Sequence, residues 1–555
     1  MRGSKLVVIM MIMLLALTPL FAGGVEEEAP AEEMVVEEGG PTNSNPLSDV
    51  RVRKAIAYAI DMDTIAETLF EGMVIVADSQ IPNGSFKAPG LEPYSYDPDR
   101  ARALLKAANW DESQVLDLVF YYGDQQTIDL MTAIQAYLAD VGVKITFRKL
   151  EGDVANQLNA LPDDPVEGPA NIVWDLGYGA RAALALHEYY NGYRPGVNAN
   201  TPSDPKLNEL IDAINATSDV EKQREAFFAI ERYDSEMLYT YPLYYQKLFV
   251  VESDKVNRNG EMYGNAQYNY DWGIINWTVP EEKGKQILRT NSGPIEFFQT
   301  PWFNPGIFMT NKVVFDRLLT CDGSLAPTRG VMVDSYTLSD DGMSLELVMK
   351  DGLTWHDGSP LTADDVKFSI EMASSITPAA HPVFMGTFGS LEGYDAFKAG
   401  DADEISGVVV DGNVVTLNFA TLDPLVLLTL SQFAIMPEKY LGDADPLNFQ
   451  QDEFWQWPIG SGPYKVAEVK MNDYLVMTPF EDYVEGVAKI DEIHCYPTFD
   501  SDPNMVKNAG AGILDYAFSK NTADIKSIEA MEHMRVTEVD IPYTRMLWFN
   551  KFPKK

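Results

Sequence analysis

The residues of this chain that could bind a ligand are mostly aromatic, and they gather in three short segments. Phe297–Gly306 reads FFQTPWFNPG, Glu453–Pro458 reads EFWQWP, and Trp174–Tyr193 contains a tryptophan, several tyrosines and Asp175. A small-molecule pocket needs apolar or aromatic walls and a few directed polar groups. The candidate ligand-binding residues are Trp174, Asp175, Tyr178, Tyr190, Phe298, Trp302, Phe303, Asn304, Trp455 and Trp457. Any one of these could equally pack in a core, so only the three segments together favour a pocket.

Catalytic and metal-binding patterns are missing from the sequence. It contains no G-x-S-x-G, no H-E-x-x-H, no P-loop and no G-x-G-x-x-G that leads into a helix. The five histidines are scattered and have no metal-ligand spacing. Pairs of carboxylates arise by chance among 83 acidic residues. We therefore predict no catalytic residue, no metal and no cofactor, with a secreted hydrolase as the alternative from another class.

The elements that must position these residues alternate between helix and strand. In the stretch 94–110, Asp97 can cap a helix, Pro98 suits its first turn, and Leu104 and Leu105 share its apolar face. Residues 127–150 read as a helix, a tight turn at Gly142 and a strand. Farther along, Thr362 is expected to cap a helix, with Asp365 completing a capping box. This alternation predicts a mixed α/β fold.

Length and charge limit the architecture and the partners. A chain of 555 residues exceeds the size of one hydrophobic core, so two or more lobes are expected. The formal net charge of −41 repels phosphate backbones and anionic headgroups, which argues against a nucleic acid or a membrane surface as partner.

The start of the chain indicates export. Residues 1–22 combine two basic residues, an apolar run too short to span a bilayer and small residues near position 22, as in a signal peptide. Residues 23–44 are rich in Glu, Gly and Pro and are expected to form a disordered acidic tether. No cysteine lies near the cut for lipid attachment. Cys321 and Cys495 could form one bridge or remain free thiols.

Three motifs then reveal a resemblance. They are WHDGSPLTADDVKFS (355–369), IGSGPYKV (459–466) and DVRVRKAIAYAID (49–61). With them the chain resembles the bacterial extracellular solute-binding proteins of the peptide/nickel/oligosaccharide-binding family (family 5), the receptors of ABC importers. The resemblance implies a two-lobe periplasmic-binding-protein fold of type II, large and peptide-binding-protein-like, with the ligand in the interlobe cleft. It also implies that the three aromatic segments face that cleft.

The order of the motifs differs from that of the family, where the 49–61 block follows a strand ending in WFN. Here WFN occurs at residues 548–550, near the C-terminus. We therefore interpret the chain as circularly permuted, with a fusion of gene fragments as the less favoured account. The predicted domains are a smaller lobe of residues 45–170 plus 522–555 and a larger lobe of residues 171–521.

The ligand prediction depends on the segment that begins at Trp174. In peptide-binding relatives an Asp three residues after this Trp pairs with the ammonium group of the peptide, whereas here that position is Gly177. A buried ammonium without a carboxylate is costly, unless Asp175 substitutes. We therefore predict a small oligosaccharide, with an oligopeptide as the alternative. The expected protein is a monomer, periplasmic or secreted, that delivers its ligand to an ABC permease or, alternatively, serves as a chemotaxis receptor.

Overall fold

The computed structural model describes residues 39–82, 84, 86–260, 273–293, 298–303, 309–321, 325–376, 380–471, 473–497 and 503–555. The predicted leader, most of the predicted tether and Asn304 lie outside these residues. Within the described part, no helix is both long enough and apolar enough to cross a membrane.

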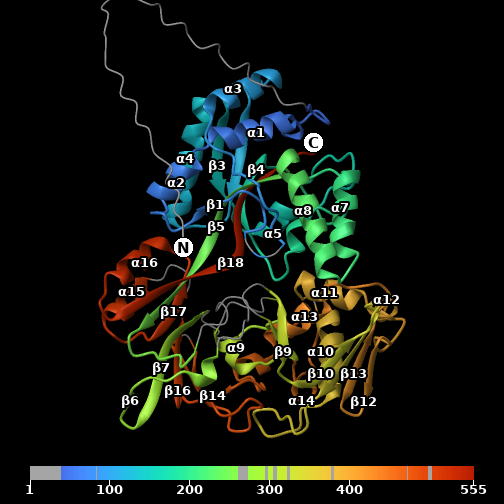
Figure 1. Ribbon diagram of the computed structural model, residues 1–555, viewed down its shortest axis with the longest axis vertical. Helices are drawn as coiled ribbons and strands as arrows, with labels where there is room; N and C mark the ends of the chain where they lie inside the picture. The colour runs from blue at the N-terminus through green and yellow to red at the C-terminus, as the bar shows by residue number, and fades with distance from the viewer. Residues whose placement is uncertain are drawn as a thin grey trace, which may run out of the picture. The chain divides into compact units, whose positions relative to one another are not determined.

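Two long antiparallel strands, β5 (Thr240–Ser253) and β18 (Met534–Phe549), run through the main sheet. The first half of β5 and the second half of β18 pair with each other beside β4 (Leu176–Ala182), and their other halves pair beside β17 (Tyr516–Ser519). Figure 1 shows both strands extending from the side of β4 to the side of β17. β5 and β18 therefore connect the two ends of one continuous sheet.

The order of the main sheet among the described residues is β14-β15-β16-β7-β17-β5-β18-β4-β2-β3, with β1 paired to β5 and β6 paired to β7. The strands not yet bounded are β1 (Ile75–Val76), β2 (Val115–Phe120), β3 (Lys144–Lys149), β6 (Glu281–Glu282), β7 (Lys285–Gly293), β14 (Tyr464–Lys470), β15 (Tyr474–Pro479) and β16 (Glu492–Pro497). β2 is parallel to both β3 and β4. The parallel strands predict helical connections, and these are present.

One set of helices covers the β2–β4 end of this sheet. It comprises α1 (Val50–Ala59), α2 (Met62–Thr68), α3 (Pro98–Ala107), α4 (Gln125–Asp140) and α5 (Val154–Asn159). The predicted helix at Asp97 is confirmed, because the Asp97 side chain accepts from the Arg100 amide at the start of α3. The predicted turn at Gly142, whose φ is 87°, is also confirmed between α4 and β3. Aliphatic side chains of α1, α3 and α4 pack with those of β2 in one buried cluster.

Aspartates begin all five of these helices and two later ones, which gives part of the acidic surplus a structural role. Each accepts a backbone N–H at a helix start that would otherwise lack a partner, and a carboxylate there also interacts favourably with the helix dipole. The capping aspartates are Asp49, Asp61, Asp97, Asp124, Asp153, Asp204 and Asp219.

A second helical layer consists of α6 (Glu188–Asn191), α7 (Pro205–Asn215) and α8 (Val220–Met237). Figure 1 shows α7 and α8 side by side. Ile211 of α7 and Phe227 and Ile230 of α8 share a buried cluster with Met546 of β18. This cluster holds the layer against the sheet.

A separate four-stranded antiparallel sheet has the order β10-β11-β13-β12. Helix α10 (Ala363–Ser375) begins with the predicted capping box of Thr362 and Asp365, which is confirmed. The remaining elements are β8 (Leu319–Cys321), β9 (Pro327–Gly330), β10 (Val333–Leu338), β11 (Ser344–Met349), β12 (Val408–Asp411), β13 (Val414–Asn418), α9 (Met309–Val314), α11 (Pro382–Gly389), α12 (Tyr394–Ala399), α13 (Val426–Gln432), α14 (Glu438–Leu441), α15 (Pro503–Gly510) and α16 (Thr522–Glu529).

The predicted α/β class is thus confirmed by the order and packing of these elements. The lobe boundaries at residues 170/171 and 521/522 stay predictions. Leu176 and Tyr178, just past the first of these boundaries, pack in the same buried cluster as Leu104 and Leu118. Cys321 and Cys495 are both buried and are not joined in a disulfide.

Candidate functional site

A pocket of about 430 Å³ opens beside β5 and β18, within the size range of about 300–1,000 Å³ usual for small-molecule sites. Its walls come from segments that are far apart in the sequence. Tyr122 follows β2, Tyr178 lies in β4, Tyr244 lies in β5, and Tyr543 and Arg545 lie in β18. We call this the arginine pocket. Its further polar lining comprises Asp124, Gln126, Thr127, Gln246, Lys520 and Asn521.

Arg545 stands among tyrosine rings in this pocket. The carbon of its guanidinium group lies 4.1 Å from the centre of the Tyr122 ring and 5.2 Å from that of Tyr543. Its Nε donates to Gln246 Oε1 at 3.3 Å. Its Nη1 is buried and has no hydrogen-bond partner among the described residues, and no described carboxylate forms an ion pair with Arg545. The positive charge is therefore not neutralised by the part of the chain that the structure describes.

The surrounding tyrosines cannot supply that negative charge. Tyr178 and Tyr244 share a hydrogen bond of 2.8 Å between their hydroxyls, and Tyr122 shares one with Tyr121 at 2.9 Å. Burial raises the pKa of Tyr178, Tyr122 and Tyr244 above the ordinary value for tyrosine. These phenols are consequently neutral at physiological pH, and they offer the guanidinium only their ring faces.

Two further charged residues, Lys520 and Asp124, line the pocket. Lys520 Nζ lies 4.9 Å from the centre of the Tyr543 ring. The carboxylate of Asp124 is engaged in capping α4, because it accepts from both the backbone amide and the hydroxyl of Thr127. The cationic side chains of Arg545 and Lys520 can bind an anionic group of a ligand. The tyrosine ring faces can cover an adjacent apolar or aromatic group.

A second pocket, of about 460 Å³, brings together two of the three predicted aromatic segments. Phe298 and Phe303 come from the first segment and Trp455 comes from the second. The other lining residues among those described are Gln299, Gln450, Gln451, Asp452, Gln456 and Met471. We call this the glutamine pocket.

Tyr178 is the only described residue of the Trp174 segment in either of these two pockets. Trp174 is buried in a cluster with Val119 and Phe552, and its Nε1 donates to the carbonyl oxygen of Gln157 at 3.0 Å. Asp175 is 2% exposed and pairs with Lys554 Nζ at 2.6 Å. Asp175 also accepts from the Asp117 amide, so its carboxylate is occupied by the chain itself.

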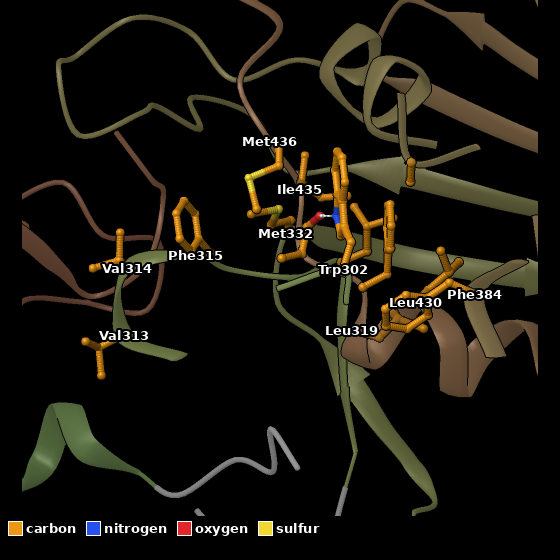
Figure 2. Packing of buried hydrophobic residues seen from close by; sticks show 14 of the residues in the cluster. Trp302, Val313, Val314, Phe315, Leu319, Met332, Phe384, Leu430, Ile435 and Met436 are labelled. Atoms are coloured by element: carbon orange, nitrogen blue, oxygen red, sulfur yellow. Dashed lines mark hydrogen bonds between the residues drawn. The ribbon is translucent and has the colours of Figure 1, made fainter. Parts of the chain in front are cut away.

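Three other predicted residues also lie outside both pockets. Tyr190 is fully buried in the cluster beneath α7 and α8. Trp302 lies in a cluster of buried hydrophobic residues (Figure 2) and stacks on Phe433 and on Phe449. Its Nε1 donates to the carbonyl oxygen of Ala434 at 2.8 Å. Trp457 is 47% exposed on the surface.

Gly177 stands where peptide-binding relatives have the Asp described above, and the indole ring of Trp548 covers it. A Cβ on Gly177 would lie 3.1 Å from the ring of Trp548, and one on Gly179 would lie 2.1 Å from it. The two glycines allow Trp548 of β18 to lie flat against β4. Sequence reasoning missed both Arg545 and Trp548. The signal for Arg545 was a single charged residue in the mostly apolar stretch IPYTRMLWFN (541–550).

Comparison with known proteins assigns the chain to a family. Residues 39–181 and 328–552 match the family "bacterial extracellular solute-binding proteins, family 5 Middle". These ranges make up about two thirds of the chain. The chain belongs to this family and has its two-lobe α/β fold. The circular permutation stays a prediction.

Individual relatives match part of the chain. The oligopeptide-binding protein AppA of Bacillus subtilis is 27% identical over 227 residues, 40% of this chain and 38% of AppA. The nickel-binding protein NikA of Staphylococcus aureus is 24% identical over 225 residues, 40% of each chain. Among solved structures, B. subtilis AppA in complex with a nonapeptide is 22% identical, with a TM-score of 0.36 over 44% of this chain and 46% of that one. This chain thus covers less than half the length of each of these relatives.

Proposed function

We propose that this protein is the solute-binding receptor of an ABC import system and that it captures a peptide whose carboxylate binds Arg545. The observation that carries this proposal is the guanidinium in the arginine pocket, which has no anionic partner among the described residues. The names of the relatives support the class, because AppA is an oligopeptide-binding protein and other family members bind peptides or nickel.

The charge of the pocket favours a peptide over the oligosaccharide predicted from the sequence. A partly desolvated guanidinium without a counterion raises the free energy of the empty pocket, and a carboxylate can accept two parallel hydrogen bonds from it. A neutral sugar would leave that charge uncompensated. We therefore prefer the oligopeptide alternative at this site.

The same pocket suggests which end of the peptide is recognised. Asp124 caps α4, and Asp175 is paired with Lys554. Both carboxylates already accept hydrogen bonds from the chain, and Gly177 has no carboxylate. Arg545 and Lys520 would instead hold the carboxylate end of the peptide, with the tyrosine rings covering the adjacent side chain.

Function would follow from binding alone. β5 and β18 connect the two ends of the sheet beside the pocket, so a bound peptide would stabilise one arrangement of the lobes for an ABC permease to recognise. No bond is made or broken in the peptide. The proposed location is outside the cytoplasmic membrane, and the proposed state is a monomer.

Isothermal titration against tripeptides to pentapeptides, with the same peptides amidated at the C-terminus, tests the proposal. The free-acid peptides should bind, and C-terminal amidation should weaken binding at least about tenfold, the equivalent of about 1.4 kcal/mol. Arg545→Gln should produce a similar loss. Arg535→Gln is the matched control, because Arg535 lies in the same strand and pairs with Glu252 outside the pocket. Equal affinity for free-acid and amidated peptides, or binding of none of them, would overturn the proposal.

A further inference from the structure

The glutamine pocket has a lining unlike that of the arginine pocket. Four of its nine described lining residues are glutamines and three are aromatic, and no described lining residue carries a positive charge. Its one acidic residue among those described, Asp452, is engaged, because its carboxylate accepts from the Phe454 amide at 2.9 Å. The pocket therefore offers an anionic ligand no counterion among the described lining residues, and its polar groups are mostly neutral amides.

Gln450 lines this pocket and carries an unused donor. Its Oε1 accepts from the Thr300 amide at 3.3 Å, whereas its Nε2 is buried and has no hydrogen-bond partner among the described residues. A buried donor left without an acceptor costs about 1–3 kcal/mol. An oxygen atom of a bound ligand would remove that cost.

The aromatic residues can offer only ring surfaces. The indole N–H of Trp455 is already donated to the carbonyl oxygen of Phe449 at 2.7 Å, so Trp455 can contact a ligand through its ring carbons alone. Phe298 and Phe303 present only carbon. The amide groups of Gln299, Gln451 and Gln456 each carry donors and an acceptor, and all three side chains are exposed at the pocket.

We infer that the glutamine pocket is a second ligand site, which binds a neutral saccharide of one or two rings. The C–H face of a sugar ring packs against aromatic carbon, and each hydroxyl both donates and accepts, as a glutamine amide does. The volume of about 460 Å³ lies in the range of small-molecule sites. This inference does not depend on the peptide proposal, because the two pockets share no described lining residue.

Titration calorimetry with glucose, N-acetylglucosamine, maltose, cellobiose and diacetylchitobiose, each to millimolar concentration, tests this site. At least one of these sugars should bind saturably with one site per chain. Gln450→Met and Gln456→Ala should each weaken that binding at least about tenfold. Gln456 is exposed, so its variant remains informative if replacing Gln450 disturbs folding.

Two further variants separate this site from the arginine pocket. Arg545→Gln should leave saccharide binding unchanged, and so should Gln125→Ala, which alters an exposed glutamine of α4. The inference is wrong if none of the five sugars binds, if Gln456→Ala and Gln450→Met both bind as the unmodified protein does, or if Arg545→Gln abolishes the binding.

Discussion

The guanidinium of Arg545 lies 4.1 Å from the centre of the Tyr122 ring, and among the described residues its Nη1 has no hydrogen-bond partner. Tyr122 follows β2 while Arg545 lies in β18, so the contact joins two segments that are far apart in the sequence. A cation–π contact contributes about 0.5–2 kcal/mol, less than a carboxylate partner would. The unpaired guanidinium is therefore available to a ligand, and it lowers the stability of the empty protein.

Removing that charge should make the empty protein more stable and unable to bind. Arg545→Met replaces a partly desolvated cation by an apolar chain of similar length, and we expect the free energy of unfolding to rise by about 1–2 kcal/mol. Thermal melts with and without a tripeptide should show a higher midpoint and no shift on addition of the peptide. A lower midpoint for the empty variant would mean that Arg545 has a structural role instead.

Gly179→Ala should destabilise the fold through Trp548. The added Cβ would lie 2.1 Å from the indole ring, which forces the ring or strand β4 to move, and overpacking of this kind costs about 1–3 kcal/mol. Urea unfolding measures this loss. Gly386→Ala is the control, because nothing lies within 4 Å of its added Cβ in α11, and it should be neutral or gain up to about 1 kcal/mol. Equal effects at the two positions would contradict the packing argument.

Glu231→Gln should change how stability depends on pH. Burial raises the pKa of Glu231 from 4.5 to about 8, so between these pH values the folded state keeps a proton that the unfolded state has released. The stability of the unmodified protein therefore falls as pH rises across this window. Between pH 5 and about pH 8.5, the Glu231→Gln variant, which is neutral at this position, should lose about 2–4 kcal/mol less stability than the unmodified protein.

Urea titrations at several pH values measure this difference. Glu225→Gln, on the exposed face of the same helix α8, is the control and should follow the unmodified protein at every pH. Identical pH profiles for the Glu231→Gln variant and the unmodified protein would show that Glu231 does not titrate in this window.

Asn45→Ala should lower the stability of the fold, because Asn45 links the start of the described chain to residues near its C-terminus. The buried amide of Asn45 donates to the carbonyl oxygens of Asn550 and Phe552 at 2.8 and 2.7 Å. Leaving such buried acceptors without a donor costs about 1–3 kcal/mol, and chemical denaturation should show a loss of that size. Asn43→Ala removes the bond from the Asn43 amide to the Lys551 carbonyl oxygen, at a half-buried position, so its effect should be smaller.

A rearranged chain should fold, because those contacts bring Asn43 beside Lys551. We expect a protein that joins residue 555 to residue 43 through a short Gly-Ser linker, and that begins at Gly284 in the β6–β7 turn, to be soluble and to melt cooperatively. Its peptide affinity should equal that of the unmodified protein. An insoluble product without a cooperative melt would count against the predicted permutation.

The sequence by itself determined the local elements. Asp97 before Pro98, and Thr362 with Asp365, predicted the starts of two helices correctly, because a cap is formed by residues within one turn of each other. The family motifs likewise needed no structure, since each is a continuous run of residues.

Only the tertiary structure decided which aromatic residues line a pocket. Trp302 and Trp455 come from similar segments, yet Trp302 is stacked inside a core while Trp455 lines the glutamine pocket. The arginine pocket joins residues of β4, β5 and β18 with the segments that follow β2 and β17. Strand pairing between segments far apart in the sequence sets these neighbours. An alternating pattern indicates which face of a strand is buried but not which strands pair.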